Sequence, residues 1–311
     1  MNIYVSGSLA FDNIMNYSGK FADHIVPEKI HALSLSFVVE KMSVHFGGTA
    51  GNIAYSLGLL GEHPAIFSTA GNDFSKYSDH LKKNGVDISR VRIIENVKTM
   101  SATIMTDSTD SQIAGIYLGS MAFDCDLKEE GISTDSIAIV APGNLEDMVS
   151  LSQFYRRRGI PYVFDPGQQI SRLSNEELIE CIKGSKALIL NDYEMNFIME
   201  KTGLGETDLV FATDILITTF GSRGSKIKTK TESYEIPAIK VKNPVDPTGA
   251  GDAYRAGILR GLISGWSLEI VGKFASVVAA YVVEKYGSQE HFFEYSDILE
   301  RYRQNFGPLV V

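Results

Sequence analysis

Apolar residues fall into short uninterrupted runs that are separated by longer stretches with helical spacing. The runs cover residues 3–5, 65–67, 137–140, 162–164, 187–190 and 215–217. A strand that is apolar at every position suits a parallel sheet, which is covered on both faces. Helices are expected between the runs, over residues 50–61, 73–84, 145–158, 175–183, 192–201, 250–264 and 268–286. The alternation predicts a doubly wound α/β domain whose mostly parallel sheet is flanked by helices.

Two regions depart from this alternation and predict a second, smaller sheet. Residues 97–106 and 111–118 are rich in Thr, Ile, Met and Tyr and flank a polar turn at 107–110, which is typical of a β-hairpin. A similar region runs through about 11–19 and 33–46. We expect one domain over residues 1–311, with a small β-sheet lid formed from about 11–46 and 97–123. Such a lid would cover the carboxyl edge of the main sheet, where open α/β sheets bind ligands.

Composition and charge narrow the class of protein. Hydrophobic residues make up 44% of the 311 residues and charged residues 22%, which is typical of a globular domain. The net charge of −9 argues against broad binding to nucleic acid or to an anionic membrane. No signal-like N-terminus and no membrane-spanning run is visible. We therefore expect a cytoplasmic protein that binds neither nucleic acid nor membrane.

The cysteines do not indicate a metal site or a disulfide framework. Cys125 and Cys181 lie far apart in the sequence and neither has a C-x-x-C or histidine partner nearby. We expect both to be buried or partly buried thiols.

The strongest candidate for chemistry is residues 246–252, which read DPTGAGD and precede a helical stretch. Gly249 and Gly251 let backbone N–H groups converge at the start of that helix, since neither glycine carries a Cβ. Free N–H groups and the positive end of a helix dipole attract phosphate. The segment is not a Walker A loop, because G-x-x-x-x-G-K-[ST] is absent.

Asp252 is the informative residue of this segment. A carboxylate beside a phosphate site repels the phosphate, so its presence calls for another role. Accepting the proton of an attacking hydroxyl is such a role in phosphoryl transfer. The alternative is that Asp252 only caps the helix.

Four other places carry candidate site residues, each with a plainer alternative. Gly47 and Gly48 precede a helix that contains Asn52, either as a ligand site or as a tight turn. Asp12 follows the first strand, either to bind hydroxyl groups or as an ordinary turn residue. After two further strands come N-D-Y-E at 191–194 and T-F-G-S-R-G at 219–224, which would otherwise be a helix start and a glycine turn.

In this order, the motifs resemble those of the ribokinase-like (PfkB) family of carbohydrate and nucleoside kinases. The resemblance extends from Asp12 to the stretch ending at Glu290, with Tyr254 standing where Phe is commoner. It implies that Asp252 is the catalytic base and that the backbone of Gly249, Ala250 and Gly251 binds the transferring phosphoryl group. It also implies that the substrate's hydroxyl groups are bound by Asp12, Gly47, Gly48 and Asn52.

The resemblance extends to the nucleotide side of the site. ATP would be bound through Asn191, Thr219, Gly221, Gly224 and Thr248. Asn191 and Glu194 would arrange Mg²⁺ through water, which suits an ion that keeps several of its waters. A monovalent cation near the glycine loop and a homodimer formed through the lid are further implications.

Local features favour a nucleoside as the phosphoryl acceptor. Residues 111–121, 164–168 and 287–290 look like those of the adenosine and broad-specificity nucleoside kinases of bacteria and archaea. Gln112 can hydrogen-bond a base edge, and Met121 with Phe11 and Phe123 can flank a planar base, although all four can equally fill the lid's own core. The predicted reaction is transfer of the ATP γ-phosphoryl group to a nucleoside 5′-hydroxyl.

Two other functions stay open and one is excluded. The first is a kinase for a free sugar such as ribose, fructose or a keto-sugar acid. The second is a ligand-binding regulator that has lost catalysis, which the intact Asp252 and glycines disfavour. A Rossmann dehydrogenase is excluded, because G-x-G-x-x-G does not follow the first strand.

Overall fold

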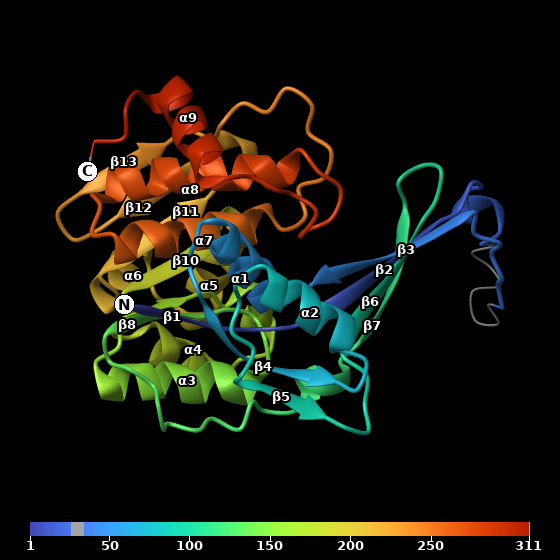
Figure 1. Ribbon diagram of the computed structural model, residues 1–311, viewed down its shortest axis with the longest axis horizontal. Helices are drawn as coiled ribbons and strands as arrows, with labels where there is room; N and C mark the ends of the chain where they lie inside the picture. Colours follow the sequence, from blue (N-terminus) through green and yellow to red (C-terminus); the bar gives the residue numbers. More distant parts are fainter. Residues whose placement is uncertain (26–33, 311) are drawn as a thin grey trace.

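The computed structural model describes residues 1–25 and 34–310 and contains two separate sheets (Figure 1). The larger sheet has nine strands in the order β13-β12-β11-β10-β9-β8-β1-β4-β5. Neighbouring strands from β11 to β5 are parallel, while β12 and β13 add an antiparallel edge. The strands are β1 (Asn2–Ser6), β4 (Ala65–Gly71), β5 (Val91–Ile94), β8 (Ser136–Val140), β9 (Tyr162–Phe164), β10 (Ala187–Asn191), β11 (Ile215–Thr219), β12 (Ser225–Lys228) and β13 (Ser233–Ile236). The predicted mostly parallel sheet is confirmed.

Helices lie on both faces of this sheet. They are α1 (Thr49–Leu59), α2 (Ser75–Lys83), α3 (Leu145–Arg158), α4 (Asn175–Ile182), α5 (Asp192–Thr202), α6 (Glu206–Ala212), α7 (Ala250–Ile263), α8 (Leu268–Val283) and α9 (Tyr295–Phe306). Short 3₁₀ helices are η1 (Phe21–Asp23), η3 (Gly119–Ala122), η4 (Gly167–Ser171) and η5 (Gly221–Arg223). All seven predicted helices are present, and the sequence pattern missed α6, α9, β5, β12 and β13.

The apolar runs are explained by burial on two sides. In β1, Ile3 and Val5 join a core cluster with residues of α1, α7 and α8, whereas Tyr4 between them joins a cluster with residues of α3, α4, α5 and α6. Alternate side chains of a strand point to opposite faces, so a strand between two helical layers is apolar at every position. A third cluster lies between α8 and α9, outside the main layers.

The smaller sheet projects from the body of the molecule (Figure 1). Its order is β3-β2-β6-β7, formed by β2 (Ala10–Asn16), β3 (Lys41–Gly47), β6 (Met100–Thr106) and β7 (Gln112–Tyr117). The predicted hairpin is confirmed, since β6 and β7 pair antiparallel. Parallel pairing of β2 with β6 joins the two predicted regions of the lid. The expected strand region 33–46 begins only at Lys41, and residues 26–33 lie outside the described residues.

Two further observations concern the cysteines and the membrane. Cys125 and Cys181 are both buried free thiols, as predicted. Within residues 1–25 and 34–310, no helix combines the length and the apolar character needed to cross a membrane.

Close packing of α7 on α8 fixes the position of α7, the helix that begins in the DPTGAGD segment. At their contact a Cβ added to Gly257 would lie 2.5 Å from the Cα of Ala275 and 3.0 Å from its Cβ. A Cβ added to Gly261 would meet Val271 at 2.9 Å. Glycines in α7 therefore let the two helix backbones approach each other.

We predict that Gly257→Ala lowers the free energy of unfolding by about 1–2 kcal/mol, because strain at the α7–α8 contact outweighs the better helix propensity of alanine. Urea-induced unfolding measures this change. Gly115→Ala is the matched control, since a Cβ at Gly115 meets nothing within 4 Å. A stability change of Gly257→Ala no larger than that of the control would contradict the prediction.

Candidate functional site

The turn between β3 and α1 places two glycines beside a carboxylate. Gly48 has φ of 86°, and a Cβ there would lie 2.5 Å from the Ser8 carbonyl oxygen. A Cβ on Gly47 would collide with the Asp12 carboxylate, so Asp12 lies directly against this turn. Thr49 Oγ1 donates to the carbonyl of Pro142 at 2.7 Å and ties the start of α1 to the main sheet. Gly47, Gly48 and Asp12 are thus brought together, as predicted.

The start of α7 is an open helix N-terminus. Gly249 is the N-cap residue with φ of 81°, and a Cβ there would lie 2.6 Å from Ser288 Cβ. Ala250 N donates to the carbonyl of Pro247, but within the described part of the chain the amides of Gly251 and Asp252 have no hydrogen-bond acceptor. Two N–H groups therefore point out of the helix, where the dipole favours an anion.

A hydrogen bond joins the two glycine turns. Asn52 Nδ2 in α1 donates to Asp252 Oδ2 in α7 at 2.8 Å. Asn52 is buried and Asp252 is partly exposed. Burial raises the pKa of Asp252 to about 6, an effect that Arg255 and the Asn52 hydrogen bond reduce and that Asp165 and Asp12 strengthen. The carboxylate is therefore basic for an aspartate, yet largely ionised at neutral pH.

Asp12 faces the same region from the lid. It lies in β2 opposite His45 of β3. Burial raises the pKa of Asp12, His45 lowers it, and Asp246 raises it further. The site thus contains several carboxylates in a partly desolvated space, and few cations face them.

The sequence does not indicate which groups Arg255 contacts. Arg255 lies one turn into α7 and forms an ion pair with Asp165, with Nη2 donating to Oδ1 at 2.8 Å. Asp165 follows β9 and is 1% exposed. Burial opposes the charge on Arg255, but the Asp165 and Asp252 carboxylates outweigh it and raise its pKa. The pair anchors the carboxyl end of β9 to α7, and no sequence motif indicates it.

The nucleotide-side residues meet at the carboxyl ends of β10 and β11. The sheet register pairs Asn191 directly with Thr219. Thr219 is partly exposed at this edge, whereas Thr218 is buried, which favours Thr219 as the polar residue of the loop. Gly221 and Gly224 follow with φ of 58° and 96°, conformations that favour glycine. Thr248 is exposed, and its N–H donates to Asp246 at 2.9 Å.

Glu194 and Asn191 form a capping box at the start of α5. Asn191 Oδ1 accepts from Glu194 N at 2.7 Å, and Glu194 Oε2 accepts from Asn191 N at 2.8 Å. The helix-capping alternative is therefore realised, and one carboxylate oxygen of Glu194 has no part in it. Within residues 1–25 and 34–310, no group of three His, Cys, Asp or Glu side chains is arranged to hold a metal ion directly. Any Mg²⁺ here fits binding through water and phosphate oxygens.

Gln112 and Met121 are not brought to the same place. Gln112 pairs with Thr106 at the outer end of the lid, whereas Asp12 pairs with Ala102, four positions along the strand. Gln112 is exposed, and its amide donates to Thr106 Oγ1 at 3.3 Å. Met121 is buried in η3, where its carbonyl accepts from Asn144 Nδ2. Both residues belong to the lid sheet, so movement of the lid as a whole would not bring Gln112 to a ligand at Asp12.

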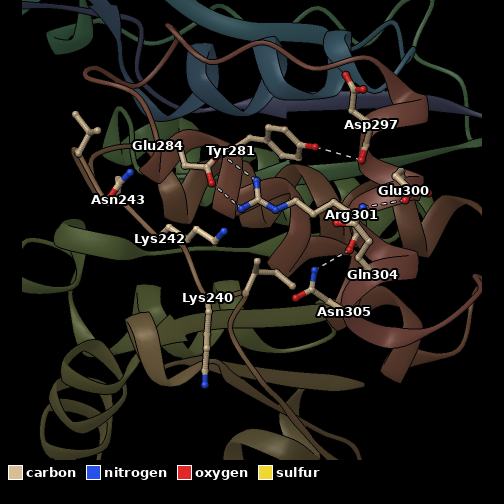
Figure 2. Close-up of a pocket in the computed structure, with 12 residues that line it drawn as sticks. Lys240, Lys242, Asn243, Tyr281, Glu284, Asp297, Glu300, Arg301, Gln304 and Asn305 are labelled. Atoms are coloured by element: carbon tan, nitrogen blue, oxygen red, sulfur yellow. Dashed lines mark hydrogen bonds and ion pairs between the residues drawn. The ribbon is translucent and has the colours of Figure 1, made fainter.

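A separate hollow lies behind the loop that leads to Asp246 (Figure 2). It has a volume of about 670 Å³ and is lined by loop 239–245, the end of α8 and α9. Arg301 crosses it, donating to both carboxylate oxygens of Glu284 at 3.1 and 2.7 Å and lying over the Tyr281 ring. None of the predicted site residues lines this hollow.

The chain is similar to known proteins over most of its length. The model of the pfkB family carbohydrate kinases matches residues 11–293. The nucleoside kinase of Methanocaldococcus jannaschii is 32% identical over 277 residues, which cover 88% of this chain and 91% of that protein. The Burkholderia thailandensis nucleoside kinase in complex with inosine is 33% identical, with a TM-score of 0.87 and coverage of 98% of both chains.

The same Burkholderia enzyme in complex with ADP-inosine is 34% identical, with a TM-score of 0.85 over 98% of this chain and 96% of that one. The family match and the full-length relatives agree with the resemblance seen in the motifs. The chain therefore belongs to the pfkB family of carbohydrate kinases.

Proposed function

We propose that this chain transfers the γ-phosphoryl group of ATP to the 5′-hydroxyl of a nucleoside. The observation that carries the proposal is the position of Asp252, a basic carboxylate next to the two open amides of α7. The similarity over nearly the whole chain to nucleoside kinases, one of them in complex with inosine, favours a nucleoside over a free sugar. The intact Asp252 and glycines argue against a silent regulator.

In the proposed mechanism Asp252 accepts the proton of the attacking 5′-hydroxyl. Its pKa of about 6 leaves it ionised at neutral pH and makes it a better base than an ordinary aspartate. The amides of Gly251 and Asp252, with Gly249 and Ala250 forming the turn, hold the transferring phosphoryl group and stabilise its developing negative charge. Asp12 and the Gly47–Gly48 turn bind the ribose hydroxyls.

ATP lies along the carboxyl ends of β10 and β11 in this proposal. Asn191 and Thr219 are adjacent there, and the turn at 221–224 follows, with open space around the Cα of Gly221. The free carboxylate oxygen of Glu194 would hold Mg²⁺ through water, and the ion would neutralise phosphate charge. A monovalent cation near this loop is a further proposal, which rests on the family resemblance alone.

The proposed acceptor predicts that the protein prefers nucleosides to free sugars in a panel assay. With ATP and Mg²⁺, adenosine, inosine, guanosine and cytidine are compared with ribose, fructose and a keto-sugar acid, and ADP formation is measured. We expect turnover of at least one nucleoside with kcat/KM well above that of every free sugar. Turnover of a free sugar with no nucleoside activity would overturn the choice of acceptor.

We predict that Asp252→Asn lowers kcat by roughly 10²–10⁴-fold, because general-base catalysis is lost, while nucleoside binding measured by calorimetry is largely retained. For the unmodified protein, kcat/KM should fall as the pH drops through about 6, since Asp252 must be ionised to accept a proton. Asp79→Asn, at an exposed aspartate of α2, is the control and should keep full activity. Near-normal turnover by Asp252→Asn would remove Asp252 from the mechanism.

We propose, in addition, that two copies of the chain pair through their lids. On the lid face opposite Asp12, Met42, Val44 and Ile113 are exposed, with exposed fractions of 59%, 57% and 47%. The partly exposed Met15 and Met105 lie in one row between Met42 and Ile113. An exposed apolar face of this kind favours burial against a partner.

The dimer is tested by sedimentation velocity. We expect Val44→Asp to shift the protein from dimer to monomer, because a charge would be buried at the interface. Phe211→Asp, at an apolar residue of α6 that is at least as exposed as Val44, is the control and should leave the dimer intact. A monomeric unmodified protein, or a dimer unaffected by Val44→Asp, would contradict the proposal.

A further inference from the structure

Gln289 connects three segments beneath the candidate active site. It lies in the loop between α8 and α9 and is 5% exposed. Its Nε2 donates to Asn52 Oδ1 in α1 at 2.9 Å and to the Tyr77 hydroxyl oxygen in α2 at 2.5 Å. The Tyr77 hydroxyl in turn donates to the carbonyl of Gly47 at 2.8 Å. A continuous chain of hydrogen bonds thus runs from Gly47 to Asp252.

The Gly47 carbonyl, at one end of this series of hydrogen bonds, determines which group donates and which accepts in each of them. The Gly47 carbonyl can only accept, so the single hydroxyl proton of Tyr77 is used there. The Tyr77 oxygen must then accept, and Gln289 must present its NH₂ group rather than its oxygen. Because that NH₂ group also faces Asn52, Asn52 presents its oxygen to Gln289. The Asn52 NH₂ group is left to face Asp252.

We propose that Gln289 is a positioning residue for phosphoryl transfer, which holds the Asn52 amide with its NH₂ group toward the Asp252 carboxylate. An asparagine amide free to rotate would also present its oxygen to Asp252, and two oxygens facing each other repel. Gln289 excludes that orientation, because its own NH₂ group requires the oxygen of Asn52. The inference rests on the proposed role of Asp252 as the base.

The chain of hydrogen bonds begins at a functional turn. Gly47 ends lid strand β3 and lies against the Asp12 carboxylate. A Cβ on Gly51 would collide with the Tyr77 hydroxyl, so the chain leaves no room for a side chain at that position. The orientation of Asn52 is therefore tied to the turn that joins the lid to the body.

Charged groups near these hydrogen bonds determine how the pKa of Asp252 would change if the orientation of Asn52 were lost. The charged groups that face Asp252 are Arg255, Asp165 and Asp12, and His80 and Glu290 lie near Gln289. The Asn52 hydrogen bond and Arg255 lower the pKa of Asp252 against the effect of burial. Loss of the oriented amide should therefore raise the pKa of Asp252 further.

The experiment measures the pH dependence of kcat/KM for the preferred nucleoside and the titration of the Asp252 carboxyl carbon by NMR. We expect Gln289→Met to move both transitions upward by up to about one pH unit, since the Asn52 amide is no longer held and its hydrogen bond to the charged Asp252 carboxylate is weakened. The deficit in kcat/KM should be large near pH 6 and small near pH 8. In an Asn52→Ala background, Gln289→Met should cause no further shift.

Tyr77→Phe supplies a second test that does not depend on the folding of Gln289→Met. It frees the orientation of Gln289 and should shift the Asp252 titration in the same direction by a smaller amount. Tyr162→Phe is the matched control, since its buried hydroxyl donates to the Cys181 carbonyl at 2.8 Å, far from this chain. It should leave the titration of Asp252 unchanged.

Two results would overturn the inference. One is an equal loss of kcat/KM at every pH with an unchanged titration of Asp252, which would make Gln289 merely structural. The other is a shift that persists in the Asn52→Ala background, which would exclude action through Asn52. An active Asp252→Asn variant would contradict the proposed role of Asp252 as the base. The NMR titration measures the effect of Gln289 on the Asp252 carboxylate without any turnover, so the two failures can be told apart.

Discussion

The hydrogen bond from Asn52 to Asp252 is the contact on which the arrangement of the site depends. It joins residues 200 positions apart in the chain and holds the start of α1 against the start of α7. Both helices begin at glycines with positive φ, Gly48 and Gly249, because a Cβ at either would collide with a neighbouring segment. Each glycine therefore lets its turn pack closely on another segment, Gly48 on Ser8 and Gly249 on Ser288.

Electrostatics impose the second constraint. Asp12 and Asp165 each act on the Asp252 carboxylate, next to the proposed phosphate site, and Arg255 is held in an ion pair with Asp165. Burial raises the pKa of all three carboxyl groups. Such a site is costly for stability at neutral pH, because each carboxylate is ionised against its preference. In the proposed mechanism the same rise in pKa makes Asp252 a stronger base, which accounts for a site that lowers stability.

Much of the fold followed from the sequence, because a strand covered on both faces is apolar throughout. The antiparallel edge was missed since β12, with the sequence SKIK, has polar residues at alternate positions and lies near the edge of the sheet. Asp252, Asn52 and the glycines were predicted from motifs, and the structure brings them together. Gln289 and Tyr77 could not be assigned this way, because their roles arise from contacts between distant segments. Gln112 was predicted near the ligand from its amide and from the resemblance of residues 111–121 to nucleoside kinases, whereas the β6–β7 register puts it at the outer end of the lid.

The central claim is that Asp252 deprotonates the acceptor hydroxyl in this ribokinase-like fold. A crystal structure of the protein with a nucleoside and a non-hydrolysable ATP analogue tests it most directly. The account predicts the 5′-hydroxyl oxygen within about 3 Å of an Asp252 carboxylate oxygen, with the γ-phosphate at the amides of Gly251 and Asp252. A 5′-hydroxyl bound instead to Asp12 or Asp165, away from those amides, would contradict it.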